Sequence, residues 1–449
     1  MKKMLFISLF VCFLSCVTTL VFPQEKTKLK LSLKEAVEKS LAQSFQSQTA
    51  ELRVKEAQSI SNQVRSQLFP QAALNLSESN QINNLSTFGL KLPGFPSLVG
   101  PFDVYEARLD VSVQLINFSN IARFYASLKN TQASKTSLLK TENELSAAAA
   151  KLYYLLKMNE AQIREAAATL KLFQAIEKLN QSQLKVGVNT PLELNRAQYQ
   201  VSLQNQRKLQ FEENYQQNKL GFLTLLNEDF NQEIELSDNF NLTLLLSPQE
   251  EKLDLPTAIA MAFEKRPELL EMQEKIKAKE QLLAAEKVSR FPSLSANFHG
   301  GYNGDQVEQL DWNRQATLNL NLPIFSGGLI QTKITQASTQ LQQQLLEKKQ
   351  LEKQIEQEVR QAVLHNSNTK QQLELAEKNK ILSKKELQMA SDRYSAGLGT
   401  NLELSLAQTN FVSAQENYLA RQAELILSQI EFHRALGDVK DWIIGEKNE

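Results

Sequence analysis

The stretch GVNTPLELNRAQ at 187–198 returns later in the chain as GLGTNLELSLAQ at 397–408. The two stretches share glycine, threonine, a Leu-Glu-Leu triplet and Ala-Gln at the same spacing. A duplicated unit of about 200 residues explains this, and its period is too long for a solenoid repeat. The sequence therefore predicts two similar halves. Three more landmarks recur in the same order: LSLKEAVEKSL (31–41) as LDLPTAIAMAF (253–263), LFPQAALNLSES (68–79) as RFPSLSANFHGG (290–301), and VQLINFSN (113–120) as LNLPIFSG (320–327).

Each quoted stretch is typical of a tight turn between two helices. In the first copy, Gly187 suits the left-handed position that ends a helix. Thr190 suits the N-cap of the next helix, and Glu193, three residues later, completes a capping box. The second copy repeats the pattern with Gly397, Thr400 and Glu403. Capping alone accounts for the two glutamates; the alternative is that they also ring the mouth of a pore.

The composition excludes several classes of function. The chain has 449 residues with only 14 Gly and 11 Pro, which favours long helices. Lys plus Arg (50) equals Asp plus Glu (50), and no basic cluster with interleaved aromatics appears, so nucleic acid is not an expected partner. The 3 histidines lack metal-ligand companions, and no Ser/His/Asp arrangement occurs. We therefore expect no enzyme activity, no metal and no cofactor.

The N-terminal segment 1–22 is predicted to be a signal peptide, because two lysines precede an uncharged apolar run. A retained anchor helix is the alternative, since about 20 apolar residues can span a bilayer. Both cysteines, Cys12 and Cys16, lie here, so the exported body has no disulfide. FLSC at 13–16 resembles a bacterial lipoprotein processing site with Cys16 as the lipid acceptor.

Four strands are predicted from period-two alternation of apolar and polar residues. They cover about 72–80, 104–117, 293–303 and 314–323, with 81–103 as a surface loop. Each has roughly the 9–11 residues that cross a bilayer at a tilt. One apolar and one polar face are typical of a membrane barrel. A soluble sheet with one wet face is the alternative.

Long helix hairpins are predicted after each pair of strands, over about 119–226 and 327–436. A helix of about 65 residues spans about 100 Å, and apolar steps of three and four indicate coiled-coil seams. The other faces are polar, as for a solvated exterior or a water-filled interior. The predicted organisation is a first repeat at 23–226, a linker at 227–256, a second repeat at 257–437 and a C-terminal tail at 438–449.

Four strands cannot close a barrel by themselves, and an open sheet edge is not tolerated in lipid. Small barrels need about eight strands. Three chains would supply about 12 strands, an even number with room for a lumen. The fold class is therefore predicted as mainly α with a β-barrel part: a trimeric α-helical tube joined to a shared transmembrane β-barrel of about 12 strands.

The chain resembles the TolC-type outer membrane efflux proteins, also called outer membrane factors, over nearly its whole mature length. The resemblance rests on the duplication, on RFPSL (290–294), on LNLPIFSGGLI (320–330) and above all on RYSAGLGTNLELSLAQTNFVSAQENY (393–418). It implies a homotrimeric exit duct in the bacterial outer membrane that extends into the periplasm. Such a duct serves a tripartite efflux or type I secretion system, with a periplasmic adaptor (membrane fusion) protein and an inner-membrane pump.

The resemblance also implies roles for residues at the helix turns. A gate is implied for Glu193, Glu403 and Tyr394. Leu406 and Gly399 depart from the family's gate, where a second acidic ring and a basic residue stand. Carboxylates gathered in a narrow mouth would favour cations. Adaptor docking is implied for Val186, Gly187, Val188, Thr190, Gly397, Leu398 and Thr400.

A surface-anchored coiled-coil structural or spacer protein is the alternative function. It explains the apolar seams of the long helices. It does not explain four amphipathic strands inserted at matched places in the two halves. Outer membrane lipid is an expected partner of the strands only if the channel interpretation holds.

Overall fold

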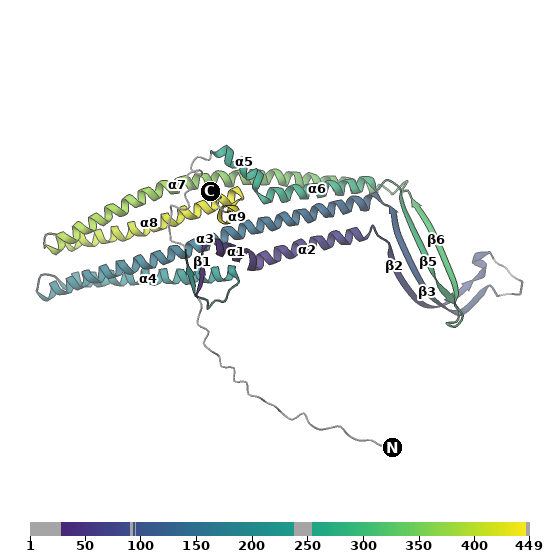
Figure 1. Ribbon diagram of the computed structural model, residues 1–449, viewed down its shortest axis with the longest axis horizontal. Helices are drawn as coiled ribbons and strands as arrows, with labels where there is room; N and C mark the ends of the chain where they lie inside the picture. The colour runs from purple at the N-terminus through teal and green to yellow at the C-terminus, as the bar shows by residue number, and fades with distance from the viewer. Residues whose placement is uncertain (1–27, 90–92, 95, 238–253, 446–449) are drawn as a thin grey trace, which may run out of the picture.

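The computed structural model describes residues 28–89, 93–94, 96–237 and 254–445. The predicted signal peptide, with Cys16, lies outside the described residues. The chain is elongated: a small sheet occupies one end, and two long helical hairpins point toward the other (Figure 1). No helix within the described ranges combines the length and apolar character needed to cross a membrane.

The sheet at one end contains four antiparallel strands in the order β2-β3-β5-β6. The strands are β2 (Gln71–Asn84), β3 (Leu98–Ile116), β5 (Ser293–Gly304) and β6 (Asp311–Asn321). The first hairpin is longer than the alternation predicts, because both strands continue into the predicted loop 81–103. A short 3₁₀ helix, Leu85–Phe88, lies at its end. The second hairpin lies close to its predicted bounds.

The two faces of the sheet differ in chemistry. Leu74, Leu318 and Leu320 point outward from one face and are exposed. On the other face, Arg108 pairs with Asp110 at 2.8 Å, and Asp110 also contacts His299 on the neighbouring strand. One apolar face and one polar face are typical of the strands of membrane barrels.

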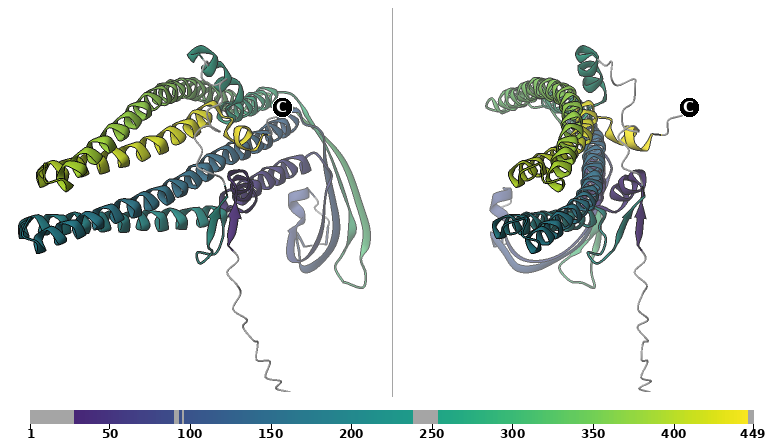
Figure 2. Two further views of the ribbon diagram at one scale, coloured as in Figure 1. Left: turned by 60° about the vertical axis from the view of Figure 1, so that its left-hand side comes forward. Right: turned by 90° about the vertical axis from the view of Figure 1, so that its left-hand side faces the viewer.

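The helical hairpins consist of four long helices. They are α3 (Phe118–Lys185), α4 (Pro191–Leu226), α7 (Leu329–Ser395) and α8 (Asn401–Leu436). Helix α3 packs against α4, α7 against α8, and α3 against α8, which joins the two hairpins. Figure 2 shows that the two hairpins lie beside each other and form a curved wall.

The helical segment that opens each half divides into two. In the first half, α1 (Leu33–Gln43) ends where Ser44 caps α2 (Phe45–Ser66) by accepting the Ser47 N–H at 3.2 Å. In the second half, the break between α5 (Leu255–Lys265) and α6 (Pro267–Val288) falls at Arg266. Proline disfavours helical geometry in the residue before it, which explains this break.

Short elements pack around the middle of the long hairpins. Strand β1 (Leu29–Leu31) pairs in parallel with β4 (Ile234–Leu236), which lies in the predicted linker 227–256. Helix α9 (Val439–Ile444) follows α8, inside the predicted C-terminal tail. We refer to β1, β4, α1, α5 and α9, with their flanking residues Arg266 and Asp438 and the parts of α7 and α8 that they contact, as the middle joint.

Charged residues buried in the middle joint are paired. Arg266 is buried and forms an ion pair with Glu358, with 2.7 Å between the guanidinium nitrogen and the carboxylate oxygen. The His433 ring stacks on Trp442 and contacts Asp438, with 2.9 Å between Nδ1 and Oδ1. Burial opposes the charged form of Asp438, but His433 and Lys265 outweigh it, so the pKa of Asp438 is lowered. This polar cluster thus joins the end of the second repeat to its beginning.

Candidate functional site at the helix tips

The turn between α3 and α4 and the turn between α7 and α8 have the same backbone design. Gly187 and Gly397 both adopt φ 74°, the left-handed region that favours glycine. In each turn the residue after this glycine bonds back to the preceding helix: the Val188 N–H donates to Gln183 at 2.9 Å, and the Leu398 N–H donates to Arg393 at 2.8 Å. The predicted helix-ending glycines therefore take the predicted conformation.

Both capping boxes are complete. The Thr190 hydroxyl accepts the Glu193 N–H at 3.4 Å, and the Glu193 carboxylate accepts the Thr190 N–H at 3.1 Å. Thr400 and Glu403 form the same pair of bonds at 3.2 and 3.3 Å. These bonds satisfy N–H groups that the first turn of a helix would otherwise leave unpaired. Within the described residues, neither a hydrogen bond nor an ion pair joins Glu193 to Glu403.

Apolar side chains project from both tips. Val186 and Val188 are each 73% exposed and Leu398 is 74% exposed. Leu192 and Leu402, in the first turns of α4 and α8, are exposed as well. Contiguous apolar patches on a protein surface mark contact sites for other molecules when they are large. The sequence-predicted docking residues thus lie together at the same end of the molecule.

Tyr394 connects the two tips. Its ring packs with Leu387, Leu404 and Ala407, and it is only 7% exposed. Its hydroxyl donates to the side-chain oxygen of Asn180 on α3 at 2.6 Å. We call the hydrogen-bonded group of Tyr394, Asn180 and Asn189 the tip latch.

Asn189 completes the tip latch from the turn between α3 and α4. Its amide donates to the Tyr394 hydroxyl at 2.9 Å and to the Asn180 oxygen at 2.6 Å. Asn180 is 2% exposed, and its own amide donates to the Ile176 carbonyl. A buried amide inside an apolar seam fixes one register of neighbouring helices. The latch therefore holds the two hairpins in one arrangement at their ends.

The phenol of Tyr394 stays protonated at neutral pH. Burial raises the pKa of Tyr394, the amide donor Asn189 works in the opposite direction, and the Glu193 carboxylate raises the pKa further. A protonated hydroxyl can donate to Asn180 and accept from Asn189 at the same time. The latch is thus neutral and needs no counter-ion.

The sequence alone indicates Tyr394 but neither asparagine. Asn180 lies within the helical pattern of α3, and Asn189 lies in a turn where asparagine is common for local reasons. One signal could have found Asn180: an amide on the buried face of a long helix. The register of α3 on α8 is needed to know which face that is.

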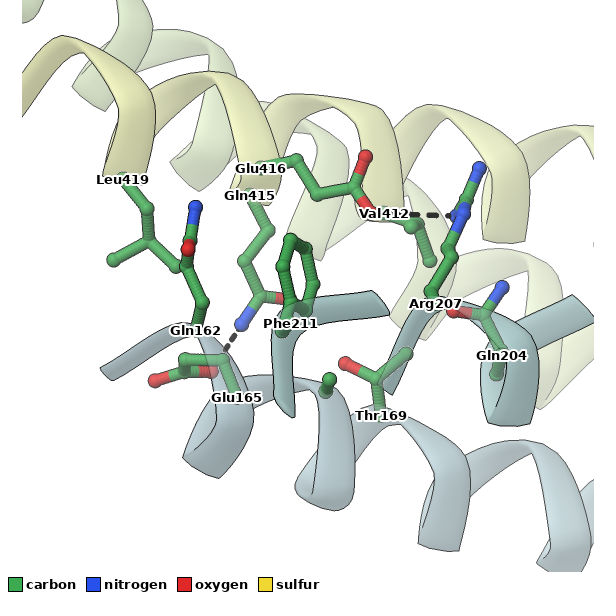
Figure 3. A pocket seen from close by; sticks show the side chains of 11 residues that line it. Gln162, Glu165, Thr169, Gln204, Arg207, Phe211, Val412, Gln415, Glu416 and Leu419 are labelled. Atoms are coloured by element: carbon green, nitrogen blue, oxygen red, sulfur yellow. Dashed lines mark hydrogen bonds and ion pairs between the residues drawn. The ribbon is translucent and has the colours of Figure 1, made fainter. Parts of the chain in front are cut away.

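A second polar link joins the hairpins farther from the tips, in a narrow pocket between α3, α4 and α8 (Figure 3). Arg207 of α4 lies 3.6 Å from Glu416 of α8. The neighbouring Gln415 donates to Glu165 of α3. Phe211, Val412 and Leu419 supply the apolar part of the lining. The pocket holds no catalytic arrangement, and the described residues contain no group of three or more metal-ligating side chains.

Comparisons with known proteins agree with this architecture. The family model described as outer membrane efflux protein matches residues 36–228 and 258–438. The probable efflux pump outer membrane protein TtgC of Pseudomonas putida is 22% identical over 383 residues, covering 83% of this chain and 76% of TtgC.

Solved structures show the same fold. The CmeC outer membrane channel of Campylobacter jejuni superimposes with a TM-score of 0.78 at 17% identity, covering 93% of this chain and 87% of CmeC. The outer membrane protein VceC of Vibrio cholerae gives a TM-score of 0.76 at 17% identity, covering 90% of this chain and 96% of VceC. The resemblance predicted from the sequence is confirmed. Because the family model matches most of the chain, in two segments that correspond to its two halves, this chain belongs to the outer membrane efflux protein family.

Proposed function

We propose that three copies of this chain form a channel, with their sheets closed into one barrel in the outer membrane and their hairpins forming a periplasmic tube. The observation that carries the proposal is the four-stranded sheet, which has an exposed apolar face and two free edges. Such a sheet is stable in lipid only if other copies close it. The polar face would then line a water-filled lumen, and no catalytic role is expected.

The apolar tips fit a periplasmic adaptor protein. Val186, Gly187, Val188 and Thr190 lie at one tip, and Gly397, Leu398 and Thr400 lie at the other, on backbones fixed by capping boxes. A rigid turn loses little conformational entropy when it binds a partner. The adaptor would connect the duct to an inner-membrane pump of an efflux or type I secretion system.

The tip latch fits the role of a gate. In a tube closed at its tips, Glu193 and Glu403 from three copies would lie near the mouth and favour cations. Opening requires the hairpins to part, and the Tyr394 hydroxyl bonds to Asn180 and Asn189 resist this. We propose that the latch sets the resting, closed state and that an adaptor shifts the balance toward the open one.

Planar-bilayer recordings of the purified mature protein test the proposal. We expect discrete channels with a preference for cations, and Glu403→Ala should weaken that preference because a ring of negative charge is lost. Tyr394→Phe should raise the open probability, since it removes the bonds between hairpins. Tyr418→Phe is the matched control, because the Tyr418 hydroxyl accepts from Gln422 within α8 and joins no hairpins.

The alternatives predict different recordings. A folded helical protein that never conducts, even as the Glu193→Ala and Glu403→Ala double variant, would support the coiled-coil spacer interpretation. If Glu403→Ala conducts with unchanged ion selectivity, the protein is still a channel. The result would mean that Glu403 does not line the mouth of the pore. Equal effects of Tyr394→Phe and Tyr418→Phe would show that the latch does not control opening.

A further inference from the structure

The two free edges of the sheet constrain how copies meet. Strand β2 forms one edge and β6 the other. In the proposed barrel, β6 of one copy must pair with β2 of the next, because a strand edge cannot remain unpaired in lipid. The inference below rests on that proposed function and concerns the register of this seam.

Each edge strand carries one charged residue on its otherwise lipid-facing side. On β6, Arg314 shares a face with Trp312, Ala316 and Leu318, because residues two apart in a strand point the same way. Arg314 is exposed and has no ion-pair partner among the residues that the structure describes. An arginine on the lipid face destabilises a barrel, and more so the deeper it lies, so an acidic partner would stabilise Arg314 there.

Glu78 is the corresponding charge on β2. It follows Leu74 and Leu76 on the outward face and is exposed. Its Cα partner on β3 is Tyr105, whose side chain is hydrogen-bonded to the Glu78 carboxylate. A carboxylate has further acceptor sites. One further acid on this face, Asp103, lies on the inner strand β3 and is bonded to Asn80 at 2.7 Å. Glu78 is therefore the acidic group that the outward face of the β2 edge presents to a neighbouring copy.

The strand pairing within one copy shows where Arg314 and Glu78 lie along the strands relative to each other. Leu74, Leu109, Gly300 and Arg314 lie in one row across the sheet. An unstaggered seam would therefore place Arg314 beside Leu74 of the next copy. In a barrel, however, the hydrogen-bond register is staggered because the strands tilt. For about 12 strands tilted by 35–45°, each group of four strands adds a register shift of about four to six residues, so β6 pairs with the next copy's β2 at that offset.

The direction of this shift follows from the strand ends. Asp311, the first residue of β6, is level with Ser77, whereas β2 continues beyond that level to Asn84. At the other end, Asn321 reaches past the level of Gln71, where β2 begins. Only a shift toward the Asn84 end leaves β6 fully paired. It must also be even, or the apolar faces would no longer match.

We propose that Arg314 of one copy forms an ion pair with Glu78 of the next copy across the β6–β2 seam. A shift of about four residues sets Arg314 opposite Glu78. A shift of about six sets it opposite Asn80, which leaves Glu78 as a diagonal neighbour within reach of a long side chain. The pair neutralises both charges at the outer part of the apolar band and fixes the register between subunits.

Paired cysteines measure the register directly in the full-length protein in outer membranes. We expect Arg314→Cys combined with Glu78→Cys, or with Asn80→Cys, to give covalent dimers and trimers after mild oxidation. Arg314→Cys combined with Leu74→Cys reports the unstaggered seam and should not cross-link. Each single-cysteine variant controls for links through Cys12 or Cys16. Cross-linking of the Leu74 pair alone, or of none of the three pairs, would overturn the seam.

Charge exchange tests the ion pair itself. Arg314→Glu and Glu78→Arg should each lower the temperature at which the detergent-resistant trimer dissociates, and the double exchange should recover most of the loss. Arg314 could instead bind a lipid phosphate. In that case Arg314→Glu lowers the dissociation temperature equally in the wild-type and in the Glu78→Ala background, and the double exchange recovers none of the loss. That outcome would overturn the proposal.

The same samples separate this inference from the proposed function. Trimers that conduct but fail both tests overturn only the seam. Protein that is monomeric by mass and does not conduct overturns the proposed channel.

Discussion

The two helix tips have the same caps but different contacts. Glycine, threonine and glutamate recur in both turns with nearly equal hydrogen bonds. The tip latch does not recur: in the alignment of the two turns, Tyr394 corresponds to Leu184, Asn189 to Gly399 and Asn180 to Ala390. Duplication has thus preserved what each backbone needs locally. The halves have diverged at the tip latch, where they contact each other.

Replacing the residues of the tip latch by their counterparts from the other half should have the largest effect on the stability of the tips. The double variant Asn189→Gly and Tyr394→Leu gives each half the side chain of the other at those positions. We expect a destabilisation of the tips of about 1–3 kcal/mol, since Asn180 remains buried without two of its partners. Hydrogen exchange at residues 183–190 and single-channel open probability should both rise.

A control variant decides whether the asymmetry matters. Leu184→Asn changes the counterpart of Tyr394 in the first half, which takes no part in the tip latch. If it opens the channel as strongly as the double variant, general softening of the tips explains the effect, and the distinction between caps and latch fails.

The glycines should behave identically in the two tips. A side chain added at Gly187 or Gly397 meets no atom within 4 Å, so Gly187→Ala and Gly397→Ala cost only the left-handed backbone, about 1–2 kcal/mol each. Local hydrogen exchange gives both values. Clearly unequal losses would mean that the backbone conformations are not equivalent.

Gly399 sharpens this comparison because its counterpart is Asn189. A Cβ there would lie 3.1 Å from the Tyr394 nitrogen. We therefore expect Gly399→Ala to disturb the latch, although Gly399 does not have the left-handed conformation of Gly397. A Ser413→Ala substitution at an exposed position of α8, away from the turn, is the reference for a neutral change.

Acid should affect the middle joint before the tips, with the smallest of these effects. Asp438 has a folded pKa below the unfolded value of about 3.9, so its contribution to stability is fully present above that value. It is lost as the pH falls through the folded pKa. The same holds for Glu358, where burial opposes ionisation but Arg266 lowers the pKa.

The acid response is measured by hydrogen-exchange protection of α9 and of the tips at pH 7 and pH 3. We expect α9 to lose protection first and Asp438→Asn to reduce the difference between the two pH values. Because the tip latch is neutral, the backbone amides of Asn180 and Asn189 should respond little, and the tips are monitored at these two residues. Equal loss in both regions would contradict this assignment.

Local patterns could be predicted from the sequence, and contacts between halves could not. The capping boxes depend on residues three apart, and the strands depend on alternation, so both are visible in one stretch. The extension of β2 and β3 beyond the predicted bounds was hidden by a register shift between Gln81 and Asn83, which interrupts the alternation. The latch joins residues more than 200 positions apart, as in the pair of Tyr394 and Asn180, and no local pattern brings them together.

The two long helices that leave the sheet, α3 and α7, differ in the residues that precede them. This difference affects how easily each helix can change its angle relative to the sheet. Neither α3 nor α7 contains an internal glycine or proline, so neither has the residues at which helices usually kink. Asn117 caps the start of helix α3, and its side chain accepts the Asn120 N–H at 3.0 Å. Helix α7 starts after Gly327 and Gly328, both left-handed and with open space around them. In the proposed channel, the pivot for widening the mouth would therefore lie some 100 Å from the helix tips, at the double glycine where α7 leaves the sheet.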